Sequence, residues 1–326
     1  MIGLALLLAG PHAFAAGQKV DTLVLGGPPA VVSYPFLHMI ESGALDDVAR
    51  QVRFELWTNP DQLRISVLQG QTDFTALPTN VAANLASRGA PVRLLNVSTW
   101  GILWMVSRDG DRRSIMDFRG ETIAIPFRGD MPDVLFGLLS AKAGLDTKKD
   151  FQLHYVATPL DAVHLIMARR VKHALLAEPA VSMLLRKTGS FPVSIIAPEL
   201  HRAFSLREEW GRVYATANRI PQAGIAAVGQ QDDRLMAKVA AAYAQSLQWC
   251  LADPPACGEL VAAAIDRLSA EAVADALRVS PMQALPTRHI ETELRQFFEL
   301  LHARDPGLIG GRLPDDAFYA FDGAQP

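Results

Sequence analysis

Cysteine, excess charge and metal-binding patterns are all scarce in this chain of 326 residues. It carries 31 Lys and Arg against 34 Asp and Glu, a net charge of −3, and it has no run of basic residues. Nucleic acid is therefore excluded as a partner, because proteins that bind it carry a basic patch or stripe. The histidines are scattered, without the HExxH or similar spacing that would place two on one ion. We expect no metal and no cofactor.

Motifs of the common enzyme classes are missing as well. The sequence has no GxSxG nucleophile elbow, no Walker loop and no GxGxxG after a predicted strand. We therefore expect that the protein is not an enzyme.

Long apolar runs are also missing, and the one apolar block near the N-terminus, residues 2–9, is too short to span a bilayer. Pro11 and the small-x-small pattern Ala13-Phe14-Ala15 follow it, which suits signal peptidase. This pattern predicts a signal peptide over residues 1–15 and a soluble periplasmic protein. Because no Lys or Arg precedes the block, an accidental pattern or a start assigned too far downstream is the alternative. No cysteine follows the block, so a lipid anchor there is unsupported.

The two cysteines, Cys250 and Cys257, flank Pro254-Pro255, which should break a helix and fold the chain back. An exported protein could oxidise them to a disulfide. Such a bridge closes a short loop and would contribute about 2 kcal/mol. The alternative is two unrelated thiols.

What the sequence does contain is an alternation of short apolar strands and helical segments with short connections, from residue 21 to a last predicted strand over residues 193–196. This alternation predicts an α/β fold with mostly parallel sheets covered on both faces. The length suits two domains of about 150 residues. We expect lobe 1 to comprise residues 16–100 and 225–326, and lobe 2 to comprise residues 101–224.

Two stretches should carry the chain between the lobes. Residues 96–106 are nearly uncharged and rich in β-branched and aromatic residues, which predicts one buried bridging strand. Residues 220–228, including Gln222, should form a second bridging strand, and residues 232–305 should be helical and pack on lobe 1. Thr99, Trp100 and Gly101 would then cross the cleft, although Trp100 could equally fill a core.

Ligands of open α/β sheets collect outside the carboxyl ends of the strands, where helix N-termini point their free N–H groups. Five predicted connections lie at such ends, around residues 26–33, 57–61, 77–80, 127–131 and 178–179. Capping alone, or an ordinary turn, is the alternative role for several of their residues. The candidate ligand-binding residues in these connections are Gly27, Pro28, Ser33, Tyr34, Trp57, Asn59, Pro78, Thr79, Asn80, Phe127, Arg128, Gly129, Asp130 and Glu178.

Arg128 is the only cation within these predicted turns, and a guanidinium binds carboxylate or sulfonate through paired hydrogen bonds. The alternative is a surface arginine paired with Asp130. Glu178 could bind an amine or a ring N–H, or could hold the turn before Pro179.

Several short motifs, in their order along residues 20–300, resemble a known family. They are Gly70-Gln71-Thr72-Asp73-Phe74, Gly89-Ala90-Pro91-Val92, residues 114–126, Ala143-Gly144-Leu145-Asp146 and Glu178-Pro179. The pattern is similar to solute-binding proteins of ABC importers, closest to the group for aliphatic sulfonates, taurine, nitrate and thiamine-precursor pyrimidines (the sulfonate/THI5-like group). The resemblance implies a type II periplasmic-binding-protein fold, with two α/β lobes joined by two crossover strands and a ligand held between them.

The resemblance further implies a monomer that delivers a small molecule to an inner-membrane permease with its ATPase. Trp57, Trp100, Tyr34 and Phe127 fall near predicted cleft segments, which favours a partly aromatic ligand. A periplasmic sensor partner is the alternative function. The pyrimidine-synthesising enzymes of this superfamily rely on a cysteine-rich segment that this chain lacks.

Overall fold

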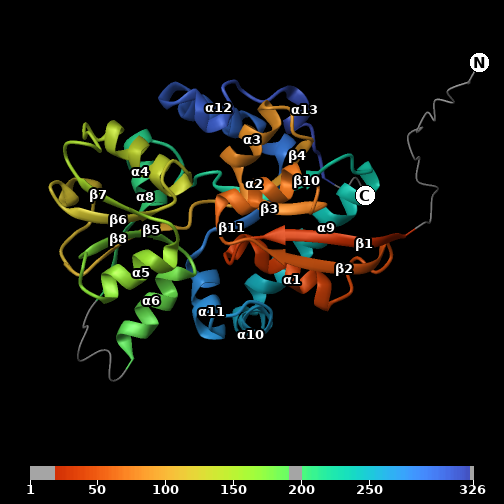
Figure 1. Cartoon of the computed structure of the whole chain (residues 1–326), viewed down its shortest axis with the longest axis horizontal. Coiled ribbons are helices and arrows are strands. Elements are labelled where there is room, and N and C mark those ends of the chain that lie inside the picture. The colour runs from red at the N-terminus through yellow and green to blue at the C-terminus, as the bar shows by residue number, and fades with distance from the viewer. Residues whose placement is uncertain (1–18, 191–199, 324–326) are drawn as a thin grey trace, which may run out of the picture.

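The computed structural model describes residues 19–190 and 200–323, which form two α/β lobes side by side (Figure 1). The signal peptide predicted over residues 1–15 and the strand predicted over residues 193–196 lie outside the described residues.

The sheet of lobe 1 has six strands in the order β11-β4-β10-β3-β1-β2. β1 pairs in parallel with β2 and β3, whereas β10 runs antiparallel to both β3 and β4. The prediction of a mostly parallel sheet is therefore wrong, because a strand arriving from the other lobe enters in the opposite direction. The strands are β1 (Val20–Gly27), β2 (Ala49–Leu56), β3 (Phe74–Pro78), β4 (Val92–Thr99), β10 (Ala223–Val228) and β11 (Met282–Pro286).

The sheet of lobe 2 repeats this arrangement with five strands in the order β7-β6-β8-β5-β9. β6 is parallel to β7 and β8, and β5, which arrives from lobe 1, is antiparallel to β8 and β9. The strands are β5 (Leu103–Ser107), β6 (Thr122–Pro126), β7 (Gln152–Val156), β8 (His173–Ala177) and β9 (His201–Ser205).

The predicted single bridging strand over residues 96–106 is wrong, since β4 and β5 lie in different sheets. The chain turns between them at Gly101, whose φ of 106° is in the region that favours glycine. A Cβ on Gly101 would also lie 2.9 Å from the side chain of Arg207. The return crossover ends in β10, which lies wholly in the first sheet, so the boundary predicted between residues 224 and 225 falls inside this strand.

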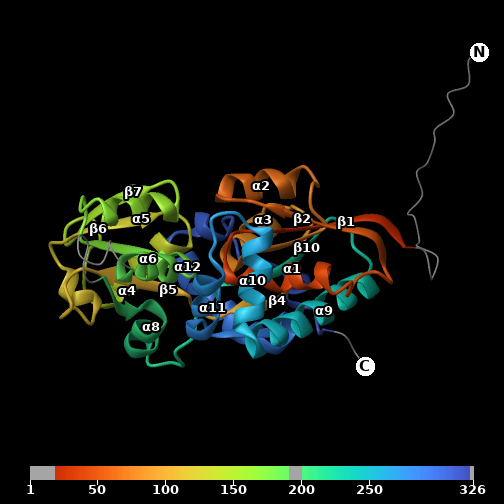
Figure 2. The same cartoon turned by 90° about the horizontal axis from the view of Figure 1, so that it is seen from below.

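Helices cover both faces of the first sheet, which explains why every residue of β10 is buried (Figures 1 and 2). One buried cluster joins one sheet face to α1, α9, α10 and α11, and another joins the opposite face to α2, α3, α12 and α13. These helices are α1 (Tyr34–Glu41), α2 (Pro60–Leu68), α3 (Thr79–Ser87), α9 (Asp233–Ala252), α10 (Pro254–Ala264), α11 (Ala270–Val279), α12 (Glu291–Arg304) and α13 (Asp316–Tyr319).

The second sheet lies between α4 and α8 on one face and α5 and α6 on the other. The buried hydrophobic cluster under α4 and α8 continues into lobe 1, where it includes residues of α2, α3 and α12. The helices are α4 (Met131–Lys142), α5 (Pro159–Met167), α6 (Ala180–Gly189) and α8 (Leu206–Tyr214), and the 3-10 turns of the chain are η1 (Val31–Ser33), η2 (Ile115–Phe118), η3 (Thr287–Ile290) and η4 (Pro306–Ile309).

Residues 232–305 were predicted to be wholly helical, and this prediction is wrong because β11 interrupts the helices. β11 pairs antiparallel with β4 and completes the edge of the first sheet. Nor does this part pack on lobe 1 alone. Arg304 at the end of α12 donates from Nη1 to the carbonyl of Gly137 in α4 at 3.0 Å, and Phe297 lies 5.9 Å from Trp210 of α8, between ring centroids.

Candidate functional site in the cleft between the lobes

The carboxyl ends of the parallel strands in both lobes lie at the edges from which the crossovers leave. In lobe 1, Pro78 at the end of β3 pairs with Ala223, where the return crossover enters the sheet. In lobe 2, Ala177 at the end of β8 pairs with Leu103, where the first crossover enters. The candidate residues predicted from strand ends are thus brought to one region between the lobes.

Four candidate residues there each have a buried polar atom with no hydrogen-bond partner among the described residues, a feature that a few residues elsewhere, such as Ser280 and Tyr319, also have. They follow three neighbouring strands, β1, β2 and β3. Buried polar atoms are almost always satisfied, so four orphans along one edge point to a ligand or water that would complete them. The atoms are Ser33 Oγ, Tyr34 OH, Trp57 Nε1 and Asn80 Oδ1.

The backbone around Ser33 is closely packed. A Cβ on Gly27 would lie 2.3 Å from Ser33 Oγ and 3.0 Å from Ser33 Cβ, so a larger residue at this position would displace the Ser33 side chain. The Gly27 carbonyl accepts from the backbone N–H of Trp57 at 3.0 Å, and the Pro28 carbonyl accepts from Ala30 at 2.8 Å. The connections after β1 and β2 therefore hold each other in place.

Tyr34 opens α1 and is completely buried. Burial, and secondarily the charge of Glu178, raises the pKa of Tyr34 well above its usual value, so its hydroxyl remains a donor at neutral pH. Because Tyr34 belongs to lobe 1 and Glu178 follows β8 of lobe 2, this electrostatic coupling acts across the cleft.

Both carboxylate oxygens of Glu178 already have partners. Arg202 of β9 donates to Oε1 from Nη2 at 2.7 Å and from Nε at 3.2 Å, and Ser182 N–H donates to Oε2 at 3.0 Å. Glu178 thus holds the start of α6 through a paired charge. The contact between Arg202 and Glu178 could not be predicted from the sequence. It forms only because β8, which precedes Glu178, and β9, which carries Arg202, both pair with β5.

Three other candidates also have structural partners. Asn59 caps α2, with Oδ1 accepting from the N–H groups of Asp61 and Gln62 at 3.1 and 3.0 Å. Pro78 stands at the N-cap of α3. Thr79 donates from Oγ1 to the Pro221 carbonyl at 2.6 Å. Asn80, the next residue, is the one that keeps an orphan atom.

The crossover residues form a hydrogen-bonded hinge. Gln222 N–H donates to the Thr99 carbonyl at 3.0 Å, and Gln222 Oε1 accepts from Ile102 N–H at 3.0 Å. Trp100 is buried, donates from Nε1 to the Gln283 carbonyl at 2.8 Å, and is covered by the Arg219 guanidinium 4.1 Å from the ring centroid. Trp100 therefore has a packing role, and its contact with a ligand stays a prediction.

The turn after β6 lies at the rim of the cleft. Arg128 is exposed, with its guanidinium 5.0 Å from the ring centroid of Tyr155, while Phe127 and Gly129 have left-handed backbone at φ 60° and 79°. Asp130 pairs with Arg64 of α2, Nη2 to Oδ1 at 2.9 Å, and not with Arg128. Burial raises the pKa of Asp130, against the opposing effect of Arg64.

Arg64 is a cation that sequence reasoning missed, although its place in a helix that starts at the cleft edge was a usable signal. With Asn80, Gly129, Asp130 and residues of η4, Arg64 lines a pocket of about 310 Å³ between the lobes. The orphaned Asn80 is thus part of a measurable cavity.

Comparison with known proteins gives relatives at the level of structure only. No family model matches the sequence, and no curated protein matches it either. The chain is similar to a solved ABC transporter structure from Parabacteroides distasonis, with a TM-score of 0.74 at 19% identity, covering 95% of this chain and 100% of the other. The chain has the periplasmic-binding-protein fold.

Two further neighbours agree with this fold. The periplasmic aliphatic sulphonate binding protein SsuA from Escherichia coli matches with a TM-score of 0.69 at 15% identity, over 94% of this chain and 93% of the other. The periplasmic nitrate-binding protein NrtA from Synechocystis PCC 6803 matches with a TM-score of 0.68 at 13% identity, over 89% and 84%. The predicted fold, and the resemblance to binding proteins of ABC importers at the level of fold, are confirmed.

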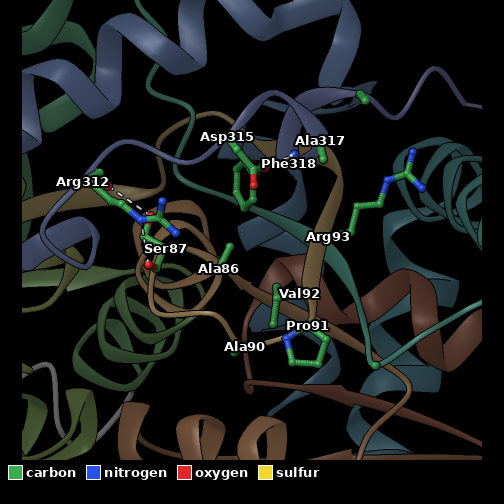
Figure 3. Close-up of a pocket in the computed structure, with 12 residues that line it drawn as sticks. Ala86, Ser87, Ala90, Pro91, Val92, Arg93, Arg312, Asp315, Ala317 and Phe318 are labelled. Carbon is green, nitrogen blue, oxygen red and sulfur yellow. Dashed lines mark hydrogen bonds between the residues drawn. The ribbon is translucent and has the colours of Figure 1, made fainter.

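A second pocket, of about 430 Å³, lies on lobe 1 of this periplasmic-binding-protein fold, and none of the predicted site residues lines it (Figure 3). Arg312 closes one side by donating from Nε to the Ser87 carbonyl at 3.1 Å. The pocket is lined by Ala86, Ser87, Ala90, Pro91, Val92, Arg93, Gly229, Arg312, Asp315, Ala317, Phe318 and Ala320.

Among the described residues, no helix is both long and apolar enough to cross a membrane. The two cysteines lie on α9 and α10, where Cys250 and Cys257 form a buried disulfide with Cα atoms 5.0 Å apart.

Proposed function

We propose that this protein is the ligand-binding component of an ABC importer, which captures a small organic molecule between its lobes and delivers it to a membrane permease. The observation that carries the proposal is the row of four orphaned polar atoms on Ser33, Tyr34, Trp57 and Asn80. The fold adds support, since neighbours that share it are described as binding aliphatic sulfonate or nitrate.

The chemistry of these four atoms favours an acceptor-rich ligand. The hydroxyls of Ser33 and Tyr34 and the indole of Trp57 can donate hydrogen bonds, whereas Asn80 Oδ1 accepts. The helices α1, α2 and α3 begin at the same edge, and their N-termini favour negative charge. We therefore expect an anionic and/or aromatic molecule, with Trp57 and Phe127 offering ring surfaces and Arg128 or Arg64 a guanidinium.

Hinge closure is the proposed mechanism. The crossovers at residues 100–102 and 215–222 would flex, while each sheet moves with its helices as a rigid lobe, one before residue 100 and after residue 222 and the other between the crossovers. Closure excludes water, which strengthens each polar contact between the ligand and the buried donors. The closed form would then dock on the permease, which works with its ATPase.

Export to the periplasm is part of the same proposal, with cleavage near Ala15 and a monomeric mature protein. Protein purified from a periplasmic extract should begin near Ala16 or Gly17. Retention of Met1 in that extract would remove the argument for export.

A periplasmic sensor partner is the second candidate, since the same closure could be read by a sensor instead of a permease. Catalysis of the pyrimidine-synthesising kind is disfavoured, because both cysteines are buried in a disulfide of the helical region and none lies at the described cleft.

Native mass spectrometry of the purified protein tests the proposal, because a trapped ligand adds a fixed mass to the chain. The compound so identified should bind protein that has been stripped by partial unfolding and refolding, with one site by calorimetry. A sensor partner would bind the same ligand, so reconstitution with the candidate permease and ATPase in proteoliposomes separates the two functions. Absence of any saturable small-molecule binding to the cleft would refute both.

A further inference from the structure

A second cluster of chemically active side chains lies at the edge of lobe 2 opposite the cleft. Asp109 follows β5, Glu121 precedes β6 and His173 begins β8. One ligand atom from each residue lies within 4.8 Å of the other two. Sheet pairing brings them together, because Ser107 and Ile123 are both register partners of His173.

His173 has no exposed surface, and its Nε2 atom has no hydrogen-bond partner among the described residues. This nitrogen points at the two carboxylates, 3.5 Å from Glu121 Oε2 and 3.9 Å from Asp109 Oδ2. At these distances Nε2 makes only a long contact with Glu121, so the nitrogen and both carboxylates could close on one ion.

Ser107 orients the ring of His173. Ser107 Oγ lies 3.0 Å from His173 Nδ1, and its hydroxyl hydrogen can go either to that nitrogen or to the Asp109 carbonyl at 3.1 Å. When the hydrogen goes to the carbonyl, Nδ1 carries the ring proton and the Nε2 lone pair faces the two carboxylates, which is the form that binds a cation. Histidines that bind metals are oriented by the same kind of hydrogen bond from the other nitrogen.

Arg112 satisfies only part of the charge. It donates from Nη2 to Glu121 Oε1 at 2.9 Å and to Asp109 Oδ2 at 3.4 Å, which leaves Glu121 Oε2 facing His173. One guanidinium against two carboxylates leaves a net negative charge beside a neutral imidazole.

We propose that Asp109, Glu121 and His173 bind a divalent transition-metal ion, with zinc as the best match to one imidazole and two carboxylates. Tetrahedral zinc with bonds of about 2.1 Å separates its ligand atoms by about 3.4 Å. The Nε2 to Oε2 distance of 3.5 Å already meets this spacing, whereas Nε2 and Asp109 Oδ2, at 3.9 Å, and the two carboxylates, within 4.8 Å of each other, would have to move closer. The ion would tie together the ends of β5, β6 and β8.

Calorimetric titration of EDTA-treated protein with zinc chloride tests the site. We expect one equivalent to bind with a Kd of about 10 µM or tighter. Glu121→Gln should weaken binding at least tenfold, and Ser107→Ala should weaken it by about 10–100-fold by releasing the ring of His173. The exposed His154 of β7 offers a matched control, and His154→Gln should leave the Kd unchanged.

His173→Gln should abolish binding, but it changes a buried residue and could prevent folding. Glu121→Gln therefore decides the question, since the Glu121 side chain is 31% exposed and should tolerate an amide. Failure of the wild type to bind zinc, or an unchanged Kd for Glu121→Gln, would overturn the proposal. Neither result bears on the cleft, because the cluster lies at the opposite edge of lobe 2.

Discussion

Arg64 and Asp130 connect the two lobes through an ion pair, with 2.9 Å between Arg64 Nη2 and Asp130 Oδ1. The Arg64 side chain is 37% exposed, so solvent screening limits the pair to about 1 kcal/mol or less. Arg64→Ala should shift the population toward the open form and raise the apparent Kd for ligand by up to about fivefold. Small-angle scattering should show a larger radius of gyration for the unliganded variant.

Arg50→Ala is the matched control, because Arg50 pairs with Asp21 inside lobe 1. It should change neither the scattering nor the affinity. Identical behaviour of the two variants would mean that the ion pair does not contribute to closure.

Arg128 is the residue expected to bind an acidic group on the ligand. To do so, its exposed guanidinium must move from the ring of Tyr155 into the cleft. Arg128→Ala should then weaken an anionic ligand by about 1.5–3 kcal/mol, or one to two decades in Kd. Calorimetry on wild type and variant at matched melting temperature measures this change. Unchanged affinity for an acidic ligand would assign the anion to Arg64 or to helix N-termini.

The disulfide between Cys250 and Cys257 should be present in protein isolated without reductant. Titration of free thiols in the denatured, unreduced protein should find none. Reduction of the bridge should lower the free energy of unfolding by about 2 kcal/mol, since the bridge closes a loop with a separation of only seven residues. Two free thiols in the isolated protein would show that the bridge does not form.

Asp117 should make the stability of lobe 2 depend on pH. The N–H groups of Arg113 and Ser114 donate to its carboxylate, and the first of these bonds is the main cause of its lowered pKa. A carboxyl group whose pKa is lowered in the folded state stabilises the fold at pH values above its ordinary pKa of 3.8. This stabilisation is lost as the pH falls through the pKa of the folded state. Asp117→Asn should therefore cost about 0.5–2 kcal/mol at pH 7, the range for a lost cap.

Chemical denaturation at pH 7 and pH 3 measures this effect as a difference between wild type and variant. The difference should shrink at the lower pH, because the unfolded wild-type chain, whose Asp117 has the ordinary pKa of 3.8, takes up a proton there. A difference that is the same at both values would assign the loss to packing.

Features that depend on local chemistry could be predicted from the sequence. The alternation of strands and helices placed β1, β2 and β3 in order, and the rule that ligands collect at strand ends selected Ser33, Tyr34, Trp57 and Asn80. Local motifs such as the Asn59 cap could also be anticipated, because their partners lie within three residues.

Features that depend on distant pairing could not be predicted. β11 lies in a segment of helical pattern and forms only because the edge of β4 is open to it. The pairing of Arg64 with Asp130 depends on how the lobes face each other, and the cluster of Asp109, Glu121 and His173 depends on sheet register. Neither the ion pair nor the cluster can be predicted from the spacing of these residues in the sequence.

If the orphaned polar atoms at the cleft bind a ligand, two buried tyrosines should respond differently to the loss of their hydroxyls. Tyr34 and Tyr243 are both fully buried, but Tyr34 OH has no partner among the described residues, whereas Tyr243 OH donates to the Val32 carbonyl at 2.8 Å. Removing a satisfied hydroxyl costs about 1 kcal/mol, while removing an unsatisfied one should cost nothing or stabilise the fold.

Melting temperature and ligand Kd measured together for Tyr34→Phe and Tyr243→Phe therefore give the most direct test. We expect Tyr34→Phe to keep or raise the melting temperature and to weaken ligand binding by about 2–10-fold. We expect Tyr243→Phe to lower the melting temperature and to leave the Kd nearly unchanged. A Tyr34→Phe protein that is destabilised as much as Tyr243→Phe and binds ligand like the wild type would show that the Tyr34 hydroxyl does not bind ligand.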